Sequence, residues 1–180
     1  MFPSPPATPV SPKDYELAVK SILDSAASGL VSYESSHLHS ITGVDGEYII
    51  DIVATFSVLG GAKVVVLVEC KHEGRKTERH DVQVLQQKIL STGSHKGMVF
   101  STAGFQSGAI EFANAHGIAT VQFADGSTTW HTRQSGASSP PPDSAKLPAY
   151  VGWWIHGSEL SLLSPDEAKY TRQAIGLDET

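Results

Sequence analysis

The chain has 180 residues, of which 40% are hydrophobic and 18% are charged, and its formal net charge is −6. These values exclude a wholly disordered or collagen-like chain, and the length allows one domain with a real core plus tails or a small appendage. The acidic balance excludes a strongly basic coat for nucleic acid, so any binding to DNA must be local.

The cysteine content and the hydropathy of the chain indicate in which cellular compartment the protein is expected. Cys70 is the only cysteine, which excludes an internal disulfide and a zinc site built from cysteines and agrees with a reducing compartment. No stretch approaches the ~20 apolar residues of a membrane span, so no membrane partner is expected. Residues 1–12 lack a basic segment followed by an apolar core and are not expected to be a secretory signal. The expected location is the cytoplasm.

The N-terminal part predicts a disordered lead and a helix. Residues 1–10 are rich in proline and are expected to be disordered. A helix is expected next, because Ser11 suits the N-cap, Pro12 suits the first helical position and Gly29 can end it. Its apolar residues recur at helical spacing, and Glu16 lies on the border of that apolar face.

A hairpin of two strands is expected in the middle of the chain. Residues 30–46 give no clear prediction, whereas Tyr48 to Val58 is a predicted strand that contains Asp51. The pair Gly60-Gly61 turns the chain into a second strand, Val64 to Lys71. This second strand is mostly β-branched and apolar, which is typical of a strand covered on both faces. Charged side chains at its end are costly unless something uses them.

The second half alternates predicted helices and strands. Their expected ranges are 80–90 for a helix, 97–101 for a strand, 107–116 for a helix and 118–123 for a strand. Such alternation implies a βαβ unit with parallel strands and a right-handed crossover. The predicted fold class is therefore α/β, with a mixed β-sheet flanked by helices, and the corresponding domain is expected to span residues 11–134.

The C-terminal part predicts a linker and a small appendage. Residues 135–148 are rich in proline and serine, as in linkers, and residues 149–180 should form a strand and a helix opened by a capping box at Ser164 to Glu167. The appendage is too small to bury its own core, so it should dock on the main domain or on a partner. Its Trp153-Trp154 pair could stack on bases. The favoured interpretation is that the pair covers the core or forms a dimer contact.

The end of the second hairpin strand could carry chemistry. Glu69 and Lys71 share one face of this strand, and Cys70 faces the other side. A strict two-residue loop at Gly60-Gly61 would set Asp51 opposite Cys70, whereas a loop of odd length or a bulge would set it opposite Glu69. Convergence of the two carboxylates therefore predicts an odd loop or a bulge.

Such a convergence would make a metal site. The carboxylates of Asp51 and Glu69 and the backbone carbonyl of Cys70 form an all-oxygen set that suits a hard cation such as Mg²⁺ or Mn²⁺. Lys71 could orient or deprotonate a metal-bound water and offset charge in the transition state of phosphodiester hydrolysis. The alternative is structural, because an acid and a lysine two positions apart are common in strands.

These residues resemble a known nuclease signature. Asp51 followed by Glu69-Cys70-Lys71 resembles the metal-binding motif of the PD-(D/E)xK nuclease superfamily, and the stretch from Tyr15 to Phe123, with its Phe105 to Ile118 segment, is similar to Mrr-type restriction endonucleases. The resemblance implies a restriction-endonuclease-like core of helix, three-stranded meander, helix, strand, helix and strand. It also implies that Asp51 and Glu69 bind a divalent metal and that Lys71 is catalytic.

The resemblance suggests two further site residues. An acid from the first helix often joins such sites, and Glu16 is the matching position, with Glu34 as a weaker candidate. A glutamine on the helix after the Glu-x-Lys strand can also belong to the site. Gln83 is taken as that residue, and Gln86 and Gln87 compete for the role.

The function implied is a divalent-metal-dependent endodeoxyribonuclease of Mrr-like restriction type, acting on DNA. Its expected catalytic residues are Asp51, Glu69, Lys71, Glu16 and Gln83, and a homodimer would help it to cut both strands. Two departures are that Ile50 replaces the proline often found before the Asp, and that the chain has no room for a separate DNA-recognition domain of ordinary size. The alternative is a nuclease-fold domain that binds nucleic acid or a protein partner without cleavage.

Four other groups of residues have a possible functional reading. The basic cluster Lys71 to His80 could contact phosphates or be a solvated loop of alternating charge. The pair His37-x-His39 could bind metal but is expected to be exposed. Cys70 with His72 is not expected to be a nucleophile pair, and Ser107 is expected to be a helix N-cap.

Overall fold

Seven strands form one mixed sheet in the order β1-β2-β3-β4-β5-β6-β7, so each strand lies beside its neighbours in the sequence. The computed structural model describes residues 10–126 and 146–177. The β3–β4 and β4–β5 pairs are parallel and the other pairs are antiparallel. The predicted α/β class is confirmed. The strands are β1 Val31–Gly43, β2 Gly46–Val58, β3 Ala62–Lys71, β4 Lys96–Ser101, β5 Ala119–Asp125, β6 Tyr150–His156 and β7 Glu159–Leu163.

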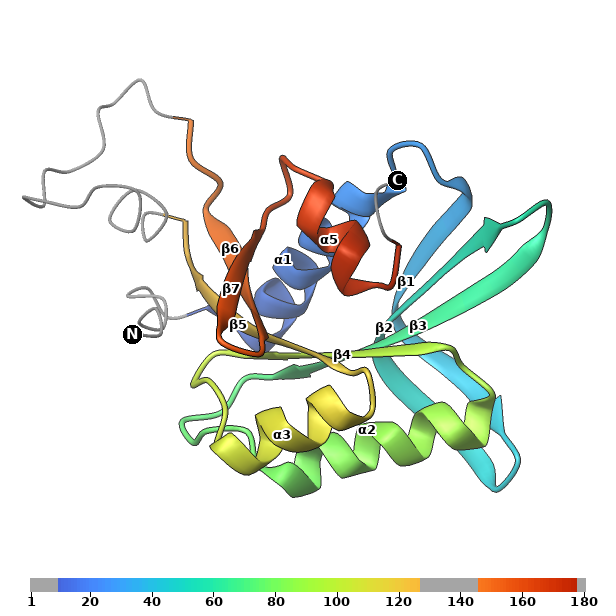
Figure 1. Ribbon diagram of the computed structural model, residues 1–180, viewed down its shortest axis with the longest axis horizontal. Coiled ribbons are helices and arrows are strands. Elements are labelled where there is room, and N and C mark those ends of the chain that lie inside the picture. The colour runs from blue at the N-terminus through green and yellow to red at the C-terminus, as the bar shows by residue number, and fades with distance from the viewer. Residues whose placement is uncertain (1–9, 127–145, 178–180) are drawn as a thin grey trace, which may run out of the picture.

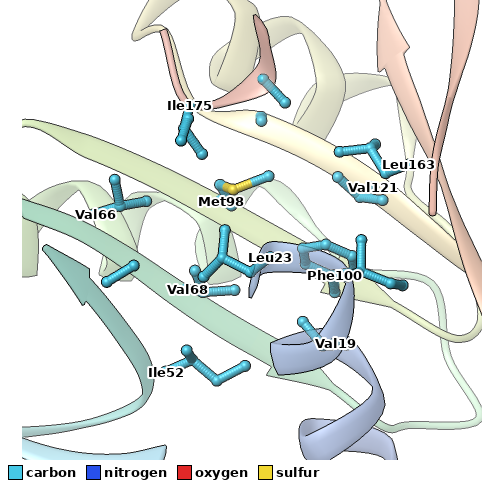
Figure 2. Close-up of a cluster of buried hydrophobic side chains, with 14 of the residues drawn as sticks. Val19, Leu23, Ile52, Val66, Val68, Met98, Phe100, Val121, Leu163 and Ile175 are labelled. Carbon is cyan, nitrogen blue, oxygen red and sulfur yellow. The ribbon is translucent and has the colours of Figure 1, made fainter. Parts of the chain in front are cut away.

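Helices cover both faces of the sheet (Figure 1). Helices α2 (Arg79–Thr92) and α3 (Ser107–Ala115) lie on one face, and α1 (Pro12–Asp24), the short 3₁₀ helix η1 (Ser25–Ala27) and α5 (Lys169–Ala174) lie on the other. Figure 2 shows the apolar core on the α1 side, where Leu23 of α1 packs with Val68 of β3 and Met98 of β4. Among the described residues, no helix has the length and apolarity needed to cross a bilayer.

Helix α1 begins as predicted. The Ser11 hydroxyl oxygen accepts the Asp14 backbone N–H at 3.1 Å, and Pro12 occupies the first turn, where its missing N–H costs nothing. The helix ends at Asp24 and passes through η1 to Gly29, whose φ of +78° suits glycine. The turn before Gly29 is therefore 3₁₀ rather than α-helical.

The hairpin between β2 and β3 has the predicted odd loop. Val58 pairs with Ala62, which leaves the three residues Leu59, Gly60 and Gly61 in the loop. Gly60 has a φ of +79°, a conformation that glycine adopts without steric cost. The prediction of an odd loop, on which the convergence of the two carboxylates depends, is confirmed.

The residue pattern did not predict strand β1, which is the first strand of the three-stranded meander that the resemblance implies. Its inward residues Tyr33, Ser35 and His37 alternate along the strand, but all three are polar and contact acids of α1, and of the three Tyr33 alone also packs against the apolar core. The usual alternation of apolar and polar residues is therefore absent.

The C-terminal segment extends the sheet. Strand β6 pairs with β5, and β7 pairs with β6, so the segment docks on the rest of the chain. The predicted lead (1–10) and linker (135–148) fall mostly on residues 1–9 and 127–145, which lie outside the described residues.

Two predicted helix starts are wrong. Ser164 and Glu167 form a β-bridge, and the Ser164 hydroxyl oxygen accepts the Asp166 N–H at 3.2 Å, so this pattern closes a local turn and α5 begins only at Lys169. Ser107 is the first residue of α3 and not its N-cap, because Gln106 holds that position.

Candidate active site

Asp51 is held beside the end of β3 by a backbone hydrogen bond. The regular pairing of β2 with β3 ends at Ile52 and Val68, and continuing it by one residue sets Asp51 opposite Glu69. The Cys70 backbone N–H donates to Asp51 Oδ2 at 2.7 Å. The Asp51 side chain thus accepts a backbone hydrogen bond just beyond the last regular pair of the β2–β3 ladder, and this bond fixes the orientation of the Asp51 carboxylate.

Glu69 forms a largely buried ion pair with Lys88 of α2. Lys88 Nζ donates to Glu69 Oε1 at 2.6 Å, and the two side chains are 18% and 12% exposed, respectively. Lys88 was not among the residues predicted for the site. A signal was present, because Lys88 lies one turn after the buried Leu85 on the helix face that covers the sheet.

The electrostatics of Asp51 show that four of the predicted residues lie close together. Burial raises the pKa of Asp51, the Cys70 N–H bond lowers it, the carboxylates of Glu69 and Glu16 raise it further, and the Lys71 ammonium lowers it. The net shift is upward. Asp51, Glu69, Glu16 and Lys71 therefore form one electrostatic group with an excess of negative charge near Asp51.

Glu16 reaches this group from α1, where His37 of β1 holds it. Glu16 Oε2 and His37 Nε2 lie 2.5 Å apart, with 18% and 19% of the side chains exposed. The expectation of an exposed His37 is wrong, because it belongs to the inward face of β1. His39 is exposed, and so no histidine pair forms there.

Within the described residues, no hydrogen bond or ion pair joins the other candidates from the resemblance to this group. Gln83 is exposed, and at 100° per residue it sits about 140° around α2 from Lys88. Gln87 is also exposed, and Gln86 lies about 160° around α2 from Lys88. Glu34 pairs with Thr55, four residues along β2 from Asp51, which corresponds to about 13 Å.

Charged residues that follow Lys71 form ion pairs with each other. Arg75 forms ion pairs with Glu73 at 2.8 Å and with Asp81 at 2.9 Å, which favours a loop of alternating charge over a phosphate contact for this residue. Cys70 packs on the α1 side, where burial, followed by the Asp51 carboxylate, raises the pKa of its thiol. The thiol is therefore protonated and unsuited to act as a nucleophile.

The donor set fits a hard cation that keeps part of its water shell. Within the described residues, Asp51 Oδ1 and Glu69 Oε2 make no hydrogen bond, since the bonds to Cys70 and Lys88 use the other oxygen of each carboxylate. The same part of the chain holds no group of three or more His, Cys, Asp or Glu side chains placed around one cation. Two carboxylates with a nearby carbonyl resemble an open magnesium site more than a closed zinc cage.

Comparison with known proteins gives one family. A crystal structure of a protein of unknown function, AF1548, is similar over 59% of this chain and 56% of that chain, with 21% sequence identity and a TM-score of 0.47, so the chain spans just over half the length of that protein. No curated protein matches. Residues 9–129, about two thirds of the chain, match the family model of the Mrr catalytic domain, described as "Restriction endonuclease". The chain therefore belongs to the Mrr-like restriction endonuclease family, as its motifs predicted.

Proposed function

We propose that this chain is a divalent-metal-dependent endonuclease that hydrolyses phosphodiester bonds of DNA. Membership of a restriction endonuclease family supports a nuclease with a DNA substrate. The observation that carries the proposal is the hydrogen bond from the Cys70 N–H to Asp51, because it orients one carboxylate beside Glu69 and Lys71 at the end of β3. An exact orientation of this kind is what metal and phosphate chemistry requires.

Each residue has a distinct role in the proposed reaction. Asp51, Glu69 and the Cys70 carbonyl would hold Mg²⁺ or Mn²⁺, which when bound acidifies a coordinated water and neutralises charge on the scissile phosphate. Lys71 would orient the attacking water and stabilise the phosphorane-like charge. Glu16, held by His37, would add a third carboxylate behind Asp51. Gln83 is exposed and would contact the DNA instead of the cation.

One contact favours a second candidate function, the binding of nucleic acid without cleavage. The Lys88 ammonium already neutralises Glu69 at 2.6 Å, as a bound cation would. A domain that never binds metal would keep this pair permanently. The two candidates therefore differ in whether Glu69 exchanges Lys88 for a metal ion.

Cleavage of supercoiled plasmid DNA in Mg²⁺ or Mn²⁺ tests the proposal. The wild type should nick or linearise the plasmid, EDTA should stop it, and Asp51→Asn and Lys71→Met should each lower the rate by about 100-fold or more. Asn at position 51 can still accept the Cys70 N–H and removes a carboxylate whose pKa is raised, so this variant should melt no lower than the wild type.

Glu34→Gln is the matched control, because it neutralises an exposed acid that pairs with Thr55 away from the site. It should cut at the wild-type rate. Cleavage that survives both Asp51→Asn and Lys71→Met would show that the active site lies elsewhere. DNA binding by a wild type that does not cut in either metal would establish the second candidate.

A further inference from the structure

A pocket of about 180 Å³ opens at the sheet edge where the parallel strands β3, β4 and β5 end. Lys71, Ser101 and Gln122 are paired in a row across these three strands, so their side chains share a face. Gln122 lines the pocket, and at ~4.8 Å per strand it lies about 10 Å from Lys71. Ligands of such sheets bind outside the carboxyl ends of the parallel strands.

The walls of the pocket combine flat apolar surface with one amide and one cation. Phe105, Ile110 and Ile155 supply the apolar surface, Gln122 is 5% exposed and brings its amide to the wall, and Lys76 is exposed. This composition suits a planar ring that has hydrogen-bonding groups on its edge and a negative charge attached nearby.

The size of the pocket limits the ligand to about one ring. An apolar cavity of about 150 Å³ is known to admit benzene, whereas drug-sized ligands occupy about 300–1,000 Å³. At about 180 Å³ the pocket accepts a substituted six-membered ring and excludes a whole nucleoside.

The pocket is pre-formed and is connected to the candidate active site. The Thr77 N–H donates to the Gly104 carbonyl at 2.8 Å, and the Gln106 N–H donates to the Thr77 carbonyl at 3.0 Å. The Ser101 hydroxyl donates to the same Gly104 carbonyl at 2.9 Å. These bonds fasten the loop after β4, which forms part of the pocket wall, to the loop that follows Lys71.

We propose that this pocket receives a single unstacked base of pyrimidine size from the DNA substrate, a few nucleotides from the phosphate that would be cut at the site of Asp51, Glu69 and Lys71. The inference rests on the proposed function for its substrate. A distance of about 10 Å corresponds to about three steps of ~3.4 Å along one strand, so the base lies within about three nucleotides of the cut. Phe105 would stack on the ring, the Gln122 amide would pair with its polar edge and Lys76 would contact the backbone.

The test compares three duplexes of one sequence that differ at a single position. That position holds a paired cytosine, an unpaired cytosine in a bulge, or an abasic residue, and binding to the full-length protein is measured by fluorescence anisotropy in EDTA. An unpaired base has already lost its pairing and most of its stacking, so little energy is needed to extrude it. The wild type should bind the bulged cytosine about tenfold more tightly than the abasic duplex, since base stacking contributes ~1–3 kcal/mol.

Three variants separate the pocket from the rest of the surface. Ala103 lines the pocket from the loop after β4, so Ala103→Trp should fill it and abolish the tenfold preference, whereas Ala103→Ser should keep it. Gln122→Leu retains the volume and removes the amide, and it should reduce the preference at least threefold. If Ala103→Trp does not fold, as judged by its melting curve, Gln122→Leu decides.

The outcomes for the pocket and for the nuclease are distinct. The pocket assignment fails if the wild type shows no preference for the bulged cytosine, or if the preference survives in the folded pocket variants. If the wild type cuts plasmid DNA but shows no preference, the nuclease assignment stands and the pocket assignment is wrong. If the wild type prefers the bulged cytosine but does not cut plasmid DNA, the pocket stands as a base-binding site and the nuclease assignment is wrong.

Discussion

Two acids of the candidate site contact a basic side chain from another element, whereas the hydrogen-bond partner of Asp51 is the Cys70 backbone N–H. Glu69 is paired with Lys88 of α2, and Glu16 contacts His37 of β1. Within the described residues, Asp51 makes no ion pair, and its pKa is raised by burial and by the neighbouring carboxylates. A desolvated carboxylate without a paired cation is unfavourable, so Asp51 marks the point where added positive charge would be most stabilising.

Lys88→Met tests whether Lys88 competes with metal for Glu69. Removing a positive charge 2.6 Å from Glu69, the proposed metal ligand, should raise the affinity for Mn²⁺ about tenfold, or ~1.4 kcal/mol, measured by titration calorimetry without DNA. Lys20→Met is the matched control, because Lys20 pairs with Asp24 on α1 and should leave the affinity unchanged. An unchanged or weaker affinity in Lys88→Met would mean that Lys88 positions Glu69 and does not compete.

Sequence reasoning located the residues of the site that lie on one hairpin. Asp51, Glu69 and Lys71 could be placed because strand parity and loop length relate them over a short stretch of chain. The contacts of Lys88 with Glu69 and of His37 with Glu16 could not be predicted, because they depend on how α2 and β1 are rotated against the sheet. That rotation is set by packing far from either residue.

Polar contacts attach strand β1 to α1, in addition to the packing of Tyr33 against the apolar core. Asp24 Oδ1 accepts hydrogen bonds from the Tyr33 hydroxyl at 3.0 Å and from the Ser35 hydroxyl at 2.5 Å, and Glu16 contacts His37 farther along. Burial and the Asp24 carboxylate raise the pKa of Tyr33, so its hydroxyl stays a donor. The same contacts explain why hydrophobic periodicity failed for β1 and succeeded for the apolar strands β3, β4 and β5.

Asp24→Ala should destabilise the protein because it removes one acceptor for two hydroxyl groups. Leaving partly buried hydroxyls unpaired costs ~1–3 kcal/mol, and a loss of about 2 kcal/mol corresponds to a fall in melting temperature of roughly 4–8 °C for a chain of this size. Thermal denaturation measures it. Glu111→Ala, an exposed acid on α3, should stay within ~0.5 kcal/mol of the wild type. An Asp24→Ala protein as stable as the control would show that these bonds contribute no net stability.

At the scale of the whole molecule, the core extends beyond the family match. The match ends at residue 129, yet Val151, Ile155, Leu163 and Ile175 are buried at 0–4% exposure, and the last three of them pack into the two cores. The C-terminal strands also cover the edge of β5. The homodimer predicted from the sequence stays a prediction.

Truncation after Thr129 should therefore abolish cooperative folding. Burying four large apolar side chains contributes about 6–12 kcal/mol, which is comparable with the ~5–15 kcal/mol that stabilises an entire domain. The truncated chain should show no cooperative melting by circular dichroism and should aggregate on gel filtration. Removing only residues 178–180 is the control and should leave melting unchanged. A truncated chain that melts cooperatively would show that residues 146–177 are dispensable.

The strictly sequential strand order has a consequence for folding during synthesis. Because every strand pairs with the one made just before it, no strand has to wait for a partner from farther along the chain. The strands and helices that carry Glu16 to Lys88 leave the ribosome before Gln122 and Ile155, which the base-sized pocket needs. The chain therefore assembles its proposed metal site first and its proposed base-recognition pocket last.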